Sequence, residues 1–169
     1  QYLFALVAIP LVGLIIAALI LVAGAMAVKR DAALTHDLMD VAVSGGNLIH
    51  TLQIERGATA GFLQSKGAKF SDALPGIRAN SDRNLSDFEL KSKSGESSGH
   101  AQLAQKIVEA RQQLKDLGDV RARASRQDLT VPEAVKRYSE TIGSLIDIIA
   151  MSGRASSDPQ ILRRSVAYL

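Results

Sequence analysis

Residues 1–28 contain no charged side chain and are almost continuously apolar until Lys29-Arg30-Asp31. As a helix this run would be roughly 40 Å long, enough to cross a bilayer core of about 30 Å. A cleaved signal peptide has an apolar core of only about 7–15 residues, and a core helix of a globular domain is usually shorter and has a polar face. We therefore predict a transmembrane helix over residues 1–28.

The orientation of this span is less constrained by the sequence. Lys29 and Arg30 alone favour a cytoplasmic C-terminal flank. The chain begins at Gln1, however, and we expect preceding residues that add positive charge on the other side. We therefore predict a protein of the inner (cytoplasmic) membrane, with residues 29–169 as a periplasmic or extracellular helical domain that is incomplete as it stands.

Composition excludes several classes of chemistry. The chain has no cysteine, so disulfides, cysteine-ligated zinc and thiol catalysis are excluded. The three histidines, His36, His50 and His100, are too dispersed for a metal centre, and we expect surface or interface positions for them. A net charge of +3 with 4% aromatic residues does not favour nucleic acid as a partner. With no phosphate-binding loop and no nucleophile–base pattern, we expect neither an enzyme nor a bound cofactor.

Helical periodicity extends through almost all of residues 29–169. We expect the first helix to continue from the membrane to about Ser65, with Gly45-Gly46 as a weak point. The other predicted helices are 75–93, 100–126, a fourth that follows a capping box at Thr130–Glu133 and stops at Gly153, and a fifth from Asp158-Pro159 to Leu169. The segment Ser92–Gly99 is a loop by composition. Short loops between amphipathic helices predict an all-α fold, an antiparallel bundle, rather than a long coiled-coil stalk.

The most unusual segment is Leu48–Leu63, where two charged residues border apolar stripes. Glu55 shares a stripe with Leu52 and Thr59, and Arg56 falls on the adjoining one. A half-buried charge is costly unless it is paired. Two interpretations are open: both charges bond to neighbouring helices and fix the bundle register, or Arg56 presents its guanidinium to a small anion in a pocket. Gly57 and Gly61, four residues apart, offer a smooth strip for a closely packed helix.

The same segment resembles a known sensor family. Leu52-Gln53-x-Glu55-Arg56-Gly57, then Gly61-Phe62-Leu63-x-Ser65-x-Gly67, and later Arg78 with Ser81-Asp82, are similar to the start of the NIT domain, the nitrate- and nitrite-sensing domain of bacterial receptors. The family is all-helical and occurs in chemoreceptors, sensor kinases, nucleotide cyclases and transcription antiterminators. The resemblance implies nitrate or nitrite as ligand and arginines as binding groups, and a second Glu-Arg motif of the family does not occur before Leu169.

From this resemblance and the residue pattern, we expect ligand-binding roles for four residues: Arg56 first, Arg78 second, and then Glu55 and Thr59. The expected function is the extracytoplasmic sensing region of a transmembrane signalling receptor, such as a chemoreceptor. It would bind a nitrate-like anion and pass a helix displacement of about 1–2 Å to a cytoplasmic signalling module. We also expect a homodimer. The rival hypothesis is a helical oligomerisation subunit of a membrane complex with no small-molecule ligand.

Overall fold

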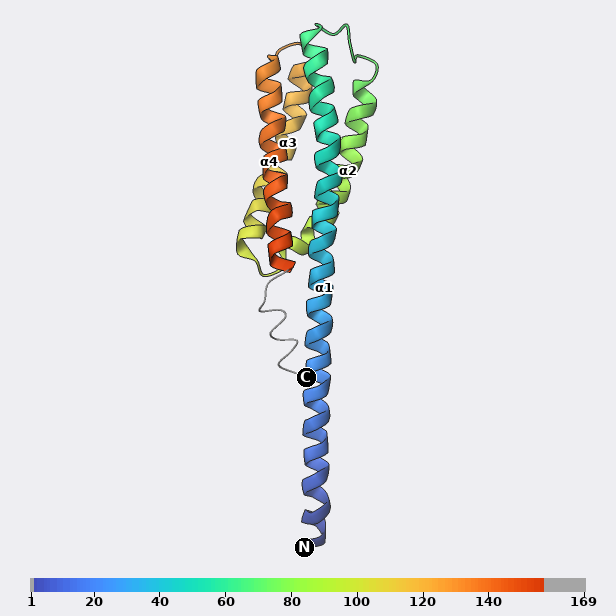
Figure 1. Ribbon diagram of the computed structural model, residues 1–169, viewed down its shortest axis with the longest axis vertical. Helices are drawn as coiled ribbons and strands as arrows, with labels where there is room; N and C mark the ends of the chain where they lie inside the picture. The colour runs from blue at the N-terminus through green and yellow to red at the C-terminus, as the bar shows by residue number, and fades with distance from the viewer. Residues whose placement is uncertain (1, 157–169) are drawn as a thin grey trace.

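The computed structural model describes residues 2–156, with side chains from Leu11 onward. Four α-helices follow one another: α1 (Tyr2–Gln64), α2 (Leu74–Glu96), α3 (Ala101–Ser125) and α4 (Val131–Ser156). The described residues form no strand. The all-α prediction is therefore confirmed, and the predicted helices match these four within a few residues at most ends (Figure 1).

Helix α1 is a single element of 63 residues, about 95 Å long at the α-helical rise. Its first half extends beyond the bundle without any covering element, as Figure 1 shows. Large apolar side chains are exposed there, including those of Leu14 (70% exposed) and Leu21 (71% exposed). Among the described residues, α1 is the one helix long and apolar enough to cross a membrane.

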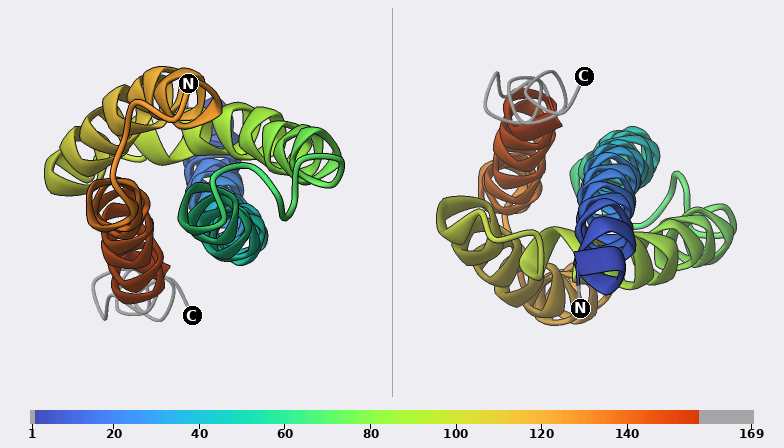
Figure 2. Two further views of the ribbon diagram at one scale, coloured as in Figure 1. Left: turned by 90° about the horizontal axis from the view of Figure 1, so that it is seen from above. Right: turned by 90° about the horizontal axis from the view of Figure 1, so that it is seen from below.

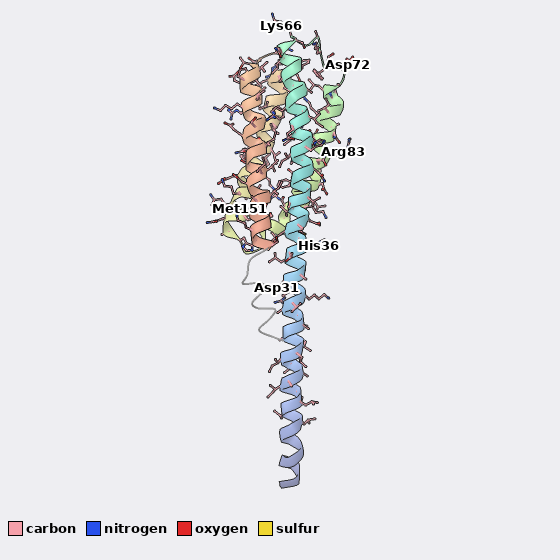
Figure 3. The ribbon with its side chains drawn as sticks, in the orientation of Figure 1. Asp31, His36, Lys66, Asp72, Arg83 and Met151 are labelled. Atoms are coloured by element: carbon pink, nitrogen blue, oxygen red, sulfur yellow. The ribbon has the colours of Figure 1, made fainter. Side chains whose placement is uncertain are left out.

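The second half of α1 joins the other three helices in an antiparallel bundle. Helix α1 packs against α2 and α4, and α3 packs against the same two helices. Figure 2 shows this arrangement along the bundle axis, and Figure 3 places Lys66 and Asp72 at the end far from the N-terminus. All four helices supply the core, whose largest fully buried side chains include Tyr138, Phe88, Leu48, Leu52, Leu103, Ile107, Leu145 and Ile148. The prediction of a bundle instead of a stalk is confirmed.

Helix α1 does not break at Gly45-Gly46, so the predicted weak point is wrong. Gly45 is buried, and a Cβ at this position would lie 3.3 Å from Ile149 of α4 and 3.7 Å from Phe88 of α2. The missing side chain therefore allows close packing on both neighbours, and that packing offsets the low helix propensity of glycine.

Two predicted helix ends also differ from the structure. Helix α2 continues through Ser92 to Glu96, because Ser92 and Gly95 are small enough to be buried and the Ser92 and Ser94 hydroxyls donate to backbone carbonyls of the preceding turn. Helix α4 passes Gly153 and ends at Ser156, with Ala155 buried against the core. The predicted fifth helix lies outside the described residues.

The capping box before α4 forms as the sequence predicts. The Glu133 carboxylate accepts hydrogen bonds from the Thr130 backbone N–H at 2.9 Å and from its hydroxyl at 2.6 Å, while the Glu133 N–H donates to Thr130 Oγ1 at 3.4 Å. These bonds satisfy donors that a helix N-terminus would otherwise leave without partners.

Candidate functional site

A buried carboxylate lies at the centre of the most polar part of the bundle. Glu55 of α1 is fully buried. Arg121 of α3 donates two parallel hydrogen bonds to its carboxylate, from Nε to Oε1 at 2.7 Å and from Nη2 to Oε2 at 2.8 Å. The hydroxyl of Tyr138, from α4, donates to Oε1 at 2.7 Å. Such a bidentate, charge-assisted pair compensates for the loss of hydration around the carboxylate.

Opposing effects set the protonation of this group. Burial would raise the pKa of Glu55, but the hydrogen bonds and charge of Arg121, with smaller contributions from Ser81 and Tyr138, hold it below its ordinary value. Burial and the negative charge of Glu55 together raise the pKa of the Tyr138 hydroxyl. Near neutral pH the carboxylate is therefore ionised, and the phenol keeps the proton that it donates.

Helix α2 extends this network toward the surface. Asp82 accepts a hydrogen bond from Arg121 Nη1 at 2.6 Å. Arg78 donates to Ser125 Oγ at 2.9 Å and to the Arg121 carbonyl at 3.3 Å, and its Nε lies 3.9 Å from Glu55 Oε1. All four helices therefore contribute to one network in which two carboxylates face two guanidiniums.

Arg56 lies apart from this network although it follows Glu55 in sequence. Its side chain is half-buried on the side of α1 that faces α4, and Nη1 donates to Ser139 Oγ at 2.9 Å. No carboxylate within the described residues pairs with it at ion-pair distance. Among the described residues, the charge of Arg56 therefore has no ion-pair partner, whereas the charge of Arg121 is matched by Glu55 and Asp82.

The four residues expected at a binding site thus divide into two groups. Glu55 and Arg78 belong to the interior network. Thr59 lies at its border, fully buried one turn after Glu55. Arg56 alone points to a different surface. The first interpretation, in which charges bond across helices and fix their register, describes the surroundings of Glu55.

The glycine strip also has a different environment from the one expected. A Cβ on Gly61 would lie 2.5 Å from the ring of Phe70, a residue of the α1–α2 loop, so a loop side chain covers this glycine instead of a helix. Nothing lies within 4 Å of the corresponding position on Gly57. Phe70 has φ +65°, a left-handed conformation that is uncommon for a side chain of this size.

Arg121 and Tyr138 were not recognised as members of the site from sequence. Arg121 is 66 positions from Glu55 and Tyr138 is 83 positions away. The available signal for Arg121 was its place beside the apolar stripe of α3, next to the buried Val120. His36 and His50 are exposed, as expected, and the described residues contain no group of side chains suited to a metal ion.

The fold is an all-helical bundle of four helices joined by one buried polar network in the described residues, and comparisons with known proteins specify the family. Residues 47–169 match the family model described as nitrate and nitrite sensing, NIT, so the chain belongs to the NIT family. The apolar residues 1–28 lie outside this match. As a sensing domain, residues 47–169 are not an enzyme, in agreement with the prediction.

Two relatives indicate the kind of protein in which such a domain is found. The nitrate regulatory protein of Klebsiella oxytoca is 29% identical over 120 residues, which cover 71% of this chain and 30% of that protein. The solved structure of the NasR transcription antiterminator aligns with a TM-score of 0.74 at 26% identity. The alignment covers 84% of this chain and 39% of the NasR chain. The chain therefore spans well under half of each relative.

These relatives correct two predictions. The expected function, an extracytoplasmic region of a transmembrane signalling receptor, is wrong, because the relatives are a regulatory protein and a transcription antiterminator. The apolar N-terminal run was given too much weight in deciding the class of the whole protein. The expectation of no nucleic-acid partner likewise conflicts with a likeness to a transcription antiterminator. Membership of a sensing family also disfavours an oligomerisation subunit without a ligand.

Proposed function

We propose that this chain is the anion-sensing domain of a regulator, that nitrate or nitrite is its ligand, and that Arg56 is the principal binding group. The observation that supports this most directly is the difference in charge partners between Arg56 and Arg121. Arg121 is neutralised by two carboxylates, while Arg56, among the described residues, donates to the hydroxyl of Ser139 and pairs with no carboxylate. A guanidinium with free donors suits a planar oxyanion, which accepts two parallel hydrogen bonds.

In this proposal the other candidate residues support the site without contacting the anion. Arg78 uses both terminal nitrogens on α3, and Glu55 is saturated by Arg121 and Tyr138. A carboxylate at the contact point would also repel an anion. Ser139 is the natural second contact, because its hydroxyl proton remains available while its oxygen accepts from Arg56.

Calorimetric titration of the full chain in detergent micelles tests the proposal. Nitrate and nitrite should bind with measurable heat, whereas chloride at equal ionic strength should not, since a spherical ion cannot use the planar fork of the guanidinium. Equal or absent heats for all three anions would refute the proposed ligand class.

We also propose that the exposed apolar part of α1 inserts in a membrane and anchors the domain there. Support comes from exposed apolar side chains such as Leu14 and Leu21, since soluble surfaces rarely leave so large an apolar area open. In a liposome flotation assay the chain should float with the lipid. The double variant Leu14→Arg/Leu21→Arg should remain at the bottom, and the control Leu90→Arg, at an exposed position on α2, should still float. Flotation of the double variant would contradict the anchor.

Finally, we propose a homodimer that pairs the outward faces of the two α1 helices. Four exposed residues of α1 repeat at intervals of four and seven residues, as on one face of a coiled coil: Met39, Val43, His50 and Ile54. The chain has no cysteine, so single cysteines can be introduced without background. Oxidation should crosslink Ile54→Cys into a dimer and leave Leu90→Cys, on α2, monomeric. Monomer alone from both variants would argue against this interface.

A further inference from the structure

Two contacts lie side by side between α1 and α4. Glu55 Oε1 accepts from the Tyr138 hydroxyl at 2.7 Å, and the next residues on each helix, Arg56 and Ser139, are joined at 2.9 Å. The first contact is fully buried and the second is half-exposed. Because consecutive helical residues differ by about 100° in direction and 1.5 Å in height, the two contacts depend on the same rotation and translation of α1 against α4.

The two contacts differ greatly in rigidity. Glu55 is held from two sides, since Arg121 binds both carboxylate oxygens while Tyr138 binds one of them. The Arg56–Ser139 contact is a single hydrogen bond between a long side chain and a hydroxyl, and water competes for both partners. The buried contact therefore determines where the exposed contact can form.

We propose that Glu55 and Tyr138 form a register clamp, a buried bond whose function is to position Arg56 and Ser139 opposite one another for the anion. The inference rests on the proposed function for the anion, but the geometry of the clamp does not. Tyr138 is then a positioning residue: it acts through Ser139, its neighbour on α4, and does not touch the ligand. A displacement of about 5.4 Å, one helical turn, would separate both pairs at once.

The test compares Tyr138→Phe with a control variant that should lower the melting temperature by a similar amount, both in the full chain. Tyr138→Phe removes only the hydroxyl, and should weaken nitrate binding in calorimetry by about fivefold or more, roughly the effect of one lost hydrogen bond. Ile107→Val also trims a fully buried side chain, but on α3 beside Gly95 of α2, and should leave affinity unchanged. Unchanged affinity in Tyr138→Phe, with a lowered melting temperature, would overturn the clamp.

A second measurement needs no ligand, and separates failure of the clamp from failure of the proposed function. Melting temperatures of Tyr138→Phe, Ser139→Ala and the double variant form a cycle. If the clamp positions the outer pair, the double variant should lose less than the sum of the single losses. The control cycle replaces Ser139→Ala by Ser144→Ala, at another half-buried serine of α4, and should be additive. If the wild-type chain binds no nitrate, the proposed function fails, and this cycle alone decides: non-additivity retains the clamp and additivity removes it.

Discussion

Removing Arg121 should expose the energetic cost of the buried Glu55 carboxylate. Arg121→Ala deletes both hydrogen bonds to Glu55, at 2.7 and 2.8 Å, and the 2.6 Å bond to Asp82. Breaking one partner of a buried pair costs about 3–5 kcal/mol because the remaining charge is left without compensation. Arg78 Nε, 3.9 Å away, can move closer and recover part of this, so we expect about 3 kcal/mol.

In a thermal melt this loss corresponds to about 9–12 °C for a domain of this size. The control is Arg123→Ala on the same helix, because Arg123 is 36% exposed and its carboxylate partner, Asp128, lies 4.0 Å away. That variant should change the free energy of unfolding by less than about 1 kcal/mol. Circular dichroism melts of both variants, with urea denaturation for the free energies, measure the difference.

The loss of unfolding free energy in Arg121→Ala, called the deficit below, should also depend on pH. In the wild-type protein the pKa of Glu55 is lowered in the folded state, so this group stabilises the fold above its unfolded pKa of about 4.3, and the contribution is lost as pH falls through the folded pKa. In the variant, burial without a partner raises the pKa, so Glu55 destabilises the fold when it is ionised. The deficit should be largest near pH 7 and shrink toward pH 4. A deficit below about 1 kcal/mol at pH 7, or one independent of pH, would refute the argument.

Two further predictions concern local structure. Thr130→Ala should lower the melting temperature by about 2–4 °C at neutral pH. The loss should be smaller in acid, because the hydrogen bonds from Thr130 lower the pKa of Glu133 and the cap is lost as pH falls through that pKa. Equal losses at both pH values would contradict the capping account. Gly61→Ala places a methyl group against the Phe70 ring and should speed tryptic cleavage at Lys66 and Lys69, while Gly57→Ala, with open space above it, should not; equal cleavage rates would show that Phe70 does not secure the loop.

The sequence was sufficient to predict the helices, because their apolar spacing is local information. The capping box at Thr130–Glu133 has the same local character. The end of α2 was misjudged because serine and glycine usually indicate a loop, whereas Ser92 and Gly95 are buried where α2 meets its neighbours. Gly95 is covered there by Val41 of α1 and Ile107 of α3, which are distant from it in sequence.

The candidate site was only partly predictable for the same reason. The helical stripe of Leu52 and Thr59 indicated that Glu55 borders the core, and the need for a partner followed from the cost of burial. The identity of that partner did not follow, since several arginines lie beside apolar stripes. Arg121 reaches Glu55 only because α1 and α3 pack against the same two helices, α2 and α4. The different surroundings of Glu55 and Arg56 likewise depend on where α4 lies, because both residues contact it.

The affinity of Arg56 variants for nitrate tests the central claim most directly. Calorimetry and melting should be measured together for wild type, Arg56→Ala, Arg56→Lys and the exposed control Arg83→Ala. The account predicts at least about tenfold weaker nitrate binding in Arg56→Ala, from the loss of a charge-assisted pair of hydrogen bonds, and incomplete rescue by lysine, which lacks the planar fork. Arg83→Ala should bind as the wild type does, and helicity should be retained throughout. Unchanged nitrate affinity in Arg56→Ala, accompanied by a large fall in melting temperature, would contradict the account and make Arg56 a packing residue.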